Sequence, residues 1–199
     1  MKRRRTAGLI LYIVGAMLLL DVGVTYARGL LASDAARAAW AREEAHRAVL
    51  SIHHQIARAP ASRVALAPGA PLAQLIIPRL GLDEIVVEGV GDDQLNAGPG
   101  HMPGSALPGE PGNAVISAHR DRHFHGLDAL AIGDTIITRT ERGRVRWVVF
   151  ARRIVSRKAP ALFATHDATL TLTTCWPVRY LGPAPDRLLI TARPIDVPR

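Results

Sequence analysis

The N-terminal part of the chain carries the strongest apolar pattern. Residues 7–27 form an almost continuous apolar run in which Asp21 is the only charged residue. About twenty residues of α-helix span the ~30 Å hydrocarbon core of a bilayer, so the run predicts a transmembrane helix over 7–27. A cleaved signal peptide is the alternative, but the run is long for one and no small-x-small cleavage site follows it.

The next pattern is that of an Ala-rich helix over 33–59, which Ser33 or Asp34 can cap and which Pro60 ends. We expect this juxtamembrane helix to pack on the folded domain or to lie against the bilayer. Residues 60–71 turn to Ala and Pro with Ser and Gly, a composition that predicts a linker. The folded domain is therefore expected to begin after this linker.

From residue 72 onward, short apolar runs alternate with turn signals, and no run is long enough to predict a major helix. Runs of this length and spacing are typical of an all-β barrel or sandwich. The segment 98–113 is rich in Gly and Pro and predicts a long irregular connection. The expected strands are 72–77, 84–88, 113–119, 134–140, 145–154, 169–174 and 187–191.

These patterns divide the chain into a basic tail over 1–6, an anchor over 7–27, a juxtamembrane helix and linker over 28–71, and a folded domain over 72–199. The basic residues at 2–5 precede the apolar run, which predicts a cytoplasmic N-terminus and an extracytoplasmic domain. The protein is thus expected to be a single-pass protein of the inner or cytoplasmic membrane.

The formal charge of +8 is concentrated in the N-terminal part. Residues 1–72 carry ten Lys and Arg against four Asp and Glu, whereas residues 73–199 carry fifteen against thirteen. The expected domain is therefore nearly neutral. It has no basic stripe interleaved with aromatic residues, so we expect no nucleic acid among its partners. The apolar run at the N-terminus makes the lipid bilayer an expected partner.

The single cysteine lies at the end of an expected strand. Residues 169–174 alternate Thr and Leu until the last two threonines, which assigns Leu170 and Leu172 to the core face and Cys175 to the more polar face. Pro177 cannot donate to a sheet, so the strand is expected to end there. A thiol in this position is placed like a nucleophile, and an inert buried cysteine is the alternative. One cysteine also excludes an internal disulfide.

Two further strand ends carry residues that a cysteine nucleophile requires. His119 ends the expected strand 113–119 and can act as a general acid and base. Arg187 begins the expected strand 187–191 and can stabilise an oxyanion or orient a substrate carbonyl. The simpler interpretations are a hydrogen-bonded structural histidine and a surface ion pair between Arg187 and Asp186. Sequence alone does not bring the three residues together.

A metal site is a further interpretation of the run from His119 to His125, which contains three histidines and Asp121. Its spacing matches no common zinc site, so we expect no metal and place His123 and His125 in an exposed loop. No organic cofactor is expected either, because no Gly-x-Gly-x-x-Gly segment opens a helix.

Together these motifs resemble the sortases, the cysteine transpeptidases of bacterial surfaces. Thr171-Leu-Thr-Thr-Cys175 is similar to their T-L-x-T-C motif, and Ser117-Ala-His-Arg-Asp121 is similar to their histidine segment. Arg187 follows the cysteine at the family's spacing, and the Gly/Pro-rich connection stands in the matching order. The short segment before the cysteine strand and the gap between Cys175 and Arg187 look like the class D and Gram-negative types.

The resemblance implies a closed eight-stranded sortase-type β-barrel and a defined reaction. Cys175 would attack the Thr–Gly bond of a C-terminal Leu-Pro-x-Thr-Gly-like sorting motif and form a thioester. His119 would serve as general acid and base, and Arg187 would hold the oxyanion or orient the substrate, with Thr174 supporting that polarisation. An amine of a cell-wall precursor or of a protein lysine would then accept the secreted protein.

Two other functions remain open at this level. One is an L,D-transpeptidase-like cysteine enzyme, although that family carries Ser-His-Gly-Cys where this chain has Thr-Thr-Cys-Trp. The other is a non-catalytic, membrane-tethered binding or assembly module. A binding module would keep its function after alkylation of Cys175, whereas a transpeptidase would lose it.

Overall fold

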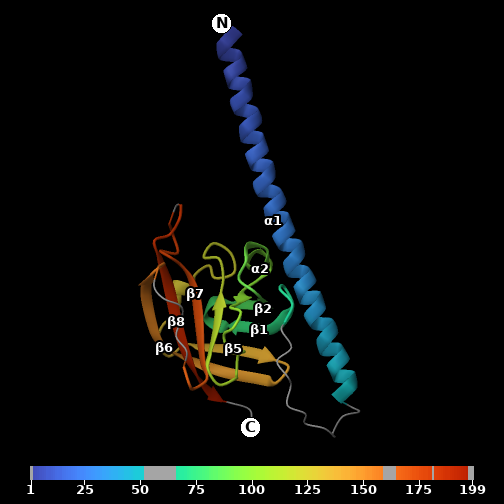
Figure 1. Ribbon diagram of the computed structural model, residues 1–199, viewed down its shortest axis with the longest axis vertical. Helices are drawn as coiled ribbons and strands as arrows, with labels where there is room; N and C mark the ends of the chain where they lie inside the picture. Colours follow the sequence, from blue (N-terminus) through green and yellow to red (C-terminus); the bar gives the residue numbers. More distant parts are fainter. Residues whose placement is uncertain (1, 52–65, 159–164, 181, 197–199) are drawn as a thin grey trace.

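The computed structural model describes residues 2–51, 66–158, 165–180 and 182–196. Side chains are described for residues 12–45 of the first helix and, outside the gaps just given, for residues 66–195. It consists of one long N-terminal helix and a β-barrel beside its second half (Figure 1). The helix, α1 (Lys2–Ser51), is continuous. The anchor and the juxtamembrane helix, expected as two segments, are therefore one element. The expected helix end at Pro60 lies outside the described residues.

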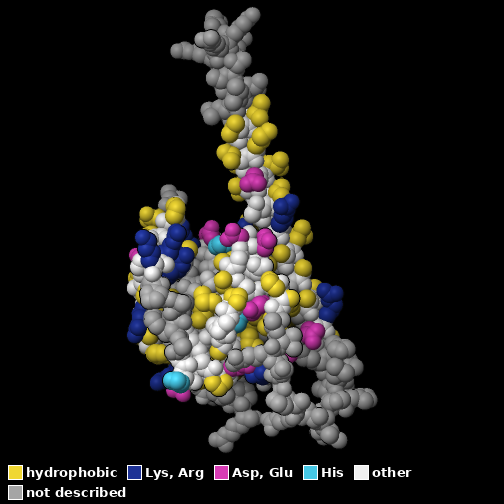
Figure 2. Space-filling view, viewed as in Figure 1, with side chains coloured by type: hydrophobic (Ala, Val, Ile, Leu, Met, Phe, Trp, Pro, Cys, Tyr) yellow, Lys and Arg dark blue, Asp and Glu magenta, His cyan; other side chains and the backbone are white. Residues whose placement is uncertain are grey.

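The first half of the described part of α1 is apolar and open. Tyr12–Ala45 is long and apolar enough to cross a membrane by length and composition, with a mean hydropathy of 1.5 in its most apolar window. Only 6% of that window is buried against the rest of the chain. Figure 2 shows these apolar side chains beyond the barrel, where Tyr12 and Leu19 are each 76% exposed. Such a segment is compatible with a single-pass membrane anchor.

The second half of α1 packs on the barrel. Ala36 and Trp40 are buried against Ile85 and Val87. An ion pair of 3.0 Å joins Arg37 to Glu84, as part of the same contact. The expectation that this helix packs on the domain is therefore confirmed, and the helix and the barrel share a small apolar interface.

Eight strands close into a barrel in the order β1-β2-β3-β4-β7-β8-β6-β5, with β5 pairing back to β1. The all-β expectation is thus confirmed as a barrel. All seven strands expected from the sequence are present. The strands are β1 (Pro71–Ile77), β2 (Leu82–Glu88), β3 (Gly100–His101), β4 (Asn113–Ser117), β5 (Thr135–Thr140), β6 (Gly143–Ser156), β7 (Thr169–Trp176) and β8 (Asp186–Asp196).

The eighth strand, β3, has only two residues and lies inside the Gly/Pro-rich connection. It pairs in parallel with β2 and antiparallel with β4, and so completes the ring. A Cβ atom at Gly100 would collide with the carbonyl oxygen of Gly89, which explains why glycine stands in this strand. The helix α2 (Asp92–Ala97) and the 3-10 turns η1 (Pro78–Leu80) and η2 (Leu127–Ala129) were also not expected.

Strand β7 lies between β4 and β8 in the ring. Leu170 and Leu172 are fully buried in the core, as their alternation predicts. The other face of β7 is buried as well, with Thr171 only 3% and Thr173 only 5% exposed. The Thr171 hydroxyl donates to Asn113 Oδ1 at 2.9 Å, which satisfies this buried polar group. The thiol therefore follows a strand that is rigidly held on both faces.

Candidate active site

The three residues expected to carry chemistry lie at or just beyond the ends of three neighbouring strands, β4, β7 and β8. Strand β7 pairs antiparallel with β8, and Cys175 is directly opposite Arg187. Strand β4 pairs in parallel with β7, and its last pair joins Ser117 to Thr173. His119 lies two residues beyond this last pair, outside the strand, where its carbonyl accepts from the Phe124 N–H. The sheet thus pairs Cys175 with Arg187 and brings the segment that carries His119 to the neighbouring edge of β7.

The cysteine and the arginine are in direct contact. Arg187 Nη1 donates to Cys175 Sγ at 3.1 Å, and both residues are half-buried. The same nitrogen lies 3.4 Å from the backbone carbonyl of Asp186. Among the described residues Arg187 forms no ion pair with the Asp186 carboxylate, so the alternative of a surface ion pair is not supported. The contact places a cationic hydrogen-bond donor directly against the sulfur atom.

The ring of His119 forms no hydrogen bond with any described residue, Cys175 included. Burial lowers its pKa from the ordinary histidine range; Asp121 and Asp92 act in the opposite direction, and Arg122 and His123 reinforce the lowering. The imidazole is therefore neutral at neutral pH and has a nitrogen lone pair available. A neutral imidazole can accept a proton from a thiol or an amine, which is what a general base requires.

The backbone around His119 is tied firmly to β7. The Ala118 N–H donates to the Thr173 carbonyl at 3.2 Å, and the Thr174 hydroxyl donates to the Ala118 carbonyl at 2.7 Å. The Phe124 N–H donates to the carbonyl of His119 itself at 3.1 Å. The Thr174 hydroxyl is thus occupied in joining β7 to the end of β4, rather than free to polarise a substrate.

A cavity of about 110 Å³ lies along the outer face of β7 and β8, and Cys175, His119 and Arg187 do not line it. Thr171 and Thr191 line it, on the faces of their strands that also carry Cys175 and Arg187. Phe150 and Arg153 from β6 form part of its wall.

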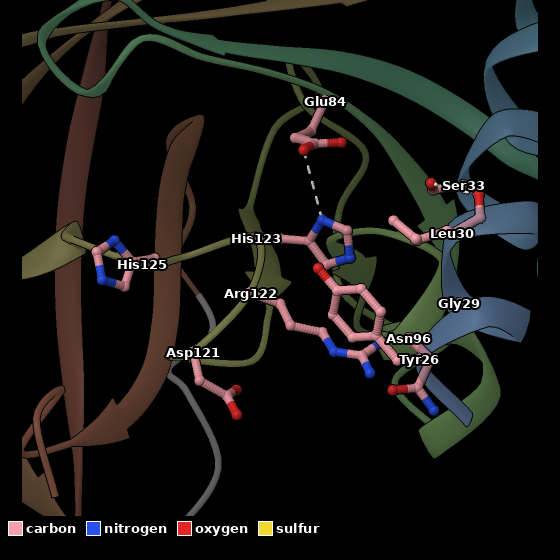
Figure 3. Close-up of a pocket in the computed structure, with 10 residues that line it drawn as sticks. All are labelled: Tyr26, Gly29, Leu30, Ser33, Glu84, Asn96, Asp121, Arg122, His123 and His125. Atoms are coloured by element: carbon pink, nitrogen blue, oxygen red, sulfur yellow. Dashed lines mark hydrogen bonds and ion pairs between the residues drawn. The ribbon is translucent and has the colours of Figure 1, made fainter. Parts of the chain in front are cut away.

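A second cavity, of about 360 Å³, lies between α1 and the segment after β4 (Figure 3). Tyr26, Leu30 and Ser33 line it from the helix, and His123 lines it from the opposite side. Cys175, His119 and Arg187 do not line this cavity. It is therefore separate from the thiol.

His123 departs from its expected place in an exposed loop, since its side chain is only 12% exposed. Its Nδ1 lies 3.5 Å from the Glu84 carboxylate. Burial would raise the pKa of Glu84, but His123 and Arg37 outweigh it and hold that pKa below the usual range. His125 is exposed, as expected. The described residues contain no group of three His, Cys, Asp or Glu placed to hold a metal ion.

Arg120 is a site residue that the sequence interpretation did not identify. Its guanidinium reaches three backbone carbonyls after the cysteine, those of Pro177, Tyr180 and Gly182. Its position directly after His119 was the only available signal, because the residues it binds are 57 to 62 positions further along the chain.

Comparison with known proteins agrees with this geometry. The family model described as Sortase domain matches residues 75–195. Sortase D of Bacillus subtilis (strain 168) is 34% identical over 118 residues, which cover 58% of this chain and 60% of that protein. The match therefore spans less than two thirds of the relative.

Two solved structures are similar at the level of the whole barrel. A sortase D5 transpeptidase from Clostridium perfringens has a TM-score of 0.61 at 26% identity, over 66% of this chain and 82% of that one. The catalytic domain of SrtD from B. anthracis has a TM-score of 0.57 at 28% identity, over 70% of this chain and 97% of that one.

Proposed function

The chain belongs to the sortase family, and on that premise we propose that it is a membrane-anchored cysteine transpeptidase with Cys175 as nucleophile, His119 as general acid and base, and Arg187 as oxyanion or substrate ligand. Its catalytic domain would be 72–199. The observation that carries the proposal is the 3.1 Å contact from Arg187 to the Cys175 sulfur. The pairing of β4 with β7, which ends two residues before His119, supports the assignment of His119.

The first half-reaction forms a thioester. Cys175 Sγ attacks the carbonyl carbon of threonine in a Leu-Pro-x-Thr-Gly-like motif, and His119 takes the thiol proton. The carbonyl oxygen becomes an oxyanion that the Arg187 guanidinium stabilises. When the C–N bond to glycine breaks, His119 returns the proton to the leaving amine. The lowered pKa of His119 favours the neutral ring that begins this cycle.

The second half-reaction transfers the protein to an amine. The acceptor nitrogen attacks the thioester carbonyl while His119 removes its proton, and the C–S bond breaks to restore the thiol. The net change exchanges one amide bond for another, so the reaction needs no cofactor. The acceptor proposed is a cell-wall precursor or a protein lysine, and the donor is a secreted protein with a C-terminal sorting signal.

The membrane helix supports a location for this reaction. In Figure 1 the connection between β7 and β8, next to Cys175, lies at the end of the barrel from which the N-terminal half of α1 extends. With the N-terminus in the cytoplasm, as the basic residues at 2–5 favour, the thiol would lie outside the cell close to the bilayer. Donor and acceptor would both be presented near that surface.

Intact-protein mass spectrometry tests the proposal. The full chain in detergent is incubated with a library of Leu-Pro-x-Thr-Gly-like peptides, with Cys175→Ala as control. We expect a thioester adduct that has lost the residues after threonine, present in the wild type and absent in the variant. Rapid iodoacetamide labelling of Cys175 without any peptide adduct would contradict the substrate class. Resistance of the folded protein to labelling would favour the non-catalytic binding module instead.

A further inference from the structure

We propose that Arg120 is a positioning residue, which holds the connection between β7 and β8 against the His119 end of β4 and so fixes one wall of the substrate site. The inference rests on the proposed function, and it assigns the arginine a role in seating the peptide rather than in the chemistry. No other described side chain hydrogen-bonds to that connection.

The contacts of Arg120 all converge on the chain just after the nucleophile. Nη1 donates to the Pro177 carbonyl at 3.2 Å, and Nη2 donates to the carbonyls of Tyr180 and Gly182 at 2.8 Å each. The guanidinium carbon also lies 5.7 Å from the centre of the Tyr180 ring. One side chain thus satisfies three carbonyls and stacks on the aromatic residue between them.

The connection depends on these bonds because it has little other support. Strand β7 ends at Trp176 and β8 begins at Asp186, so the carbonyls between them are outside the sheet ladder. Among hydrogen bonds between described residues, the remaining one in this stretch is from the Arg157 N–H to the Pro185 carbonyl, at 3.1 Å. The bonds to Tyr180 and Gly182 are exposed and the bond to Pro177 is part-buried, so each contributes modestly to stability. A single donor group that serves three carbonyls nevertheless restricts the conformations open to the segment.

Arginine is chemically suited to this task. A guanidinium offers five N–H donors in a rigid plane and can serve several acceptors at once, and its flat face can lie on an aromatic ring. Lysine carries the same charge as a compact ammonium on a flexible stem and reproduces neither the fork nor the stacking. The three carbonyls and the tyrosine together therefore require the shape of arginine as well as its charge.

The location of Arg120 links the two halves of the site. On its N-terminal side, Ala118 is bound to β7 through both its N–H and its carbonyl. On its C-terminal side, Arg120 binds the segment that leaves β7. His119 lies between these two attachments, and the connection that follows the thiol is bound to the same short segment. By contrast, the contact between Arg187 and Cys175 is set by strand pairing and does not depend on Arg120.

The test compares Arg120→Met and Arg120→Lys with a matched control, Arg79→Met, in the full chain. Arg79 also donates to a backbone carbonyl, that of Ala129 at 2.9 Å, and forms an ion pair of 3.3 Å with Asp134. It lies within η1, and among the described residues none of its contacts involves 175–186. Three quantities are measured: kcat/KM for peptide acylation, the rate of iodoacetamide labelling of Cys175, and amide hydrogen exchange of residues 177–185.

We expect Arg120→Met to lower peptide kcat/KM by about tenfold to 100-fold, mainly through KM, because a displaced wall mispositions the peptide. Iodoacetamide is too small to contact that wall, so the labelling rate of Cys175 in Arg120→Met should stay within about twofold of the wild-type rate. A direct effect of the substitution on the thiol would change the labelling rate as well. Exchange in 177–185 should accelerate in both Arg120 variants and stay unchanged in Arg79→Met.

Two results would overturn the inference: unchanged exchange in 177–185, or a parallel fall of labelling and peptide acylation. A wild type that acylates no peptide would count against the proposed function instead, while hydrogen exchange would still decide the role of Arg120. If Arg120→Met fails to fold, Arg120→Lys provides the same comparison, since it keeps the charge and removes only the planar fork.

Discussion

Two histidines lie close together on the barrel and differ in almost every contact. His101, on β3, is 3% exposed; its Nδ1 lies 2.6 Å from the Glu88 carboxylate and its Nε2 lies 3.0 Å from the Ala106 carbonyl. His119, just beyond β4, has no hydrogen bond from its ring to any described residue, and burial lowers its pKa. Strand β3, which carries His101, pairs with β4, which ends two residues before His119.

The difference separates a structural histidine from one that can move a proton. Both ring nitrogens of His101 are engaged with oxygen atoms, so any proton exchange there would break a buried network. His119 has its backbone fixed through Ala118 and its ring left without a partner. A base must be positioned but not already occupied, and only His119 meets both conditions.

The largest effect expected from this comparison is on catalysis. His119→Asn should reduce the rate of thioester formation by about 10²- to 10⁴-fold, because the proton acceptor and donor is lost. Thermal unfolding should change little, since no ring hydrogen bond is removed. Single-turnover acylation followed by mass spectrometry measures the rate. A variant that keeps wild-type acylation would remove His119 from the mechanism.

The converse effect is expected at His101. His101→Asn should lower the free energy of unfolding by about 3 kcal/mol, because the buried Glu88 carboxylate loses its partner. Urea unfolding measures the loss, and acylation per folded molecule should stay within about threefold of the wild type because the ring does not face the thiol. A stable but inactive variant would instead move His101 into the active site.

A smaller effect is expected at the hydrogen bond that joins β7 to the segment just after β4. Thr174→Val removes the hydroxyl that donates to the Ala118 carbonyl at 2.7 Å and should cost about 1–2 kcal/mol of stability. Acylation should fall several-fold, because the end of β4 is less firmly held. Thr174→Ser keeps the hydroxyl and is the matched control for both denaturation and acylation. Equal behaviour of the two variants would show that the hydrogen bond has no role in positioning His119.

The smallest effect concerns the charge next to the free ring. Asp121 is exposed and raises the pKa of His119 against the effect of burial, so Asp121→Asn should lower that pKa further. In the proposed mechanism neutral His119 starts the reaction, so activity should fall as pH drops through its pKa. The acid limb of kcat/KM should therefore move to lower pH, by about a few tenths of a unit because the carboxylate is solvated. A shift to higher pH would contradict the assignment of that limb to His119.

Local periodicity was sufficient to predict much of the barrel. The alternation in β7 placed Leu170 and Leu172 in the core, and the proline after Trp176 marked the strand end. Strands with clear alternation were found because each repeats its pattern over several residues. Strand β3 was missed because two residues carry no period and its close contact with Gly89 is visible only in the folded chain.

The site was predictable only as a set of separate residues. Cys175, His119 and Arg187 could be selected from residue type and strand ends, but their alignment depends on the order β4-β7-β8, which no local pattern determines. Arg120 could not be found, because its partners are backbone carbonyls that any sequence would supply. A contact between a side chain and the backbone of a distant residue cannot be inferred from the type of that residue.

The unbroken course of α1 has a further consequence. A helix of 50 residues is ~75 Å long, of which the span of a bilayer requires about 30 Å, and the rest runs beside the barrel. Ala36 and Trp40 seat the barrel directly on this rod, so under the proposed anchoring the thiol would have a set height above the membrane instead of the reach of a flexible tether. Encounters with a membrane-bound donor and acceptor would then become collisions in a plane, limited by lateral diffusion. A substrate whose scissile bond lies far above the lipid headgroups would not reach the thiol, whatever the concentration of that substrate.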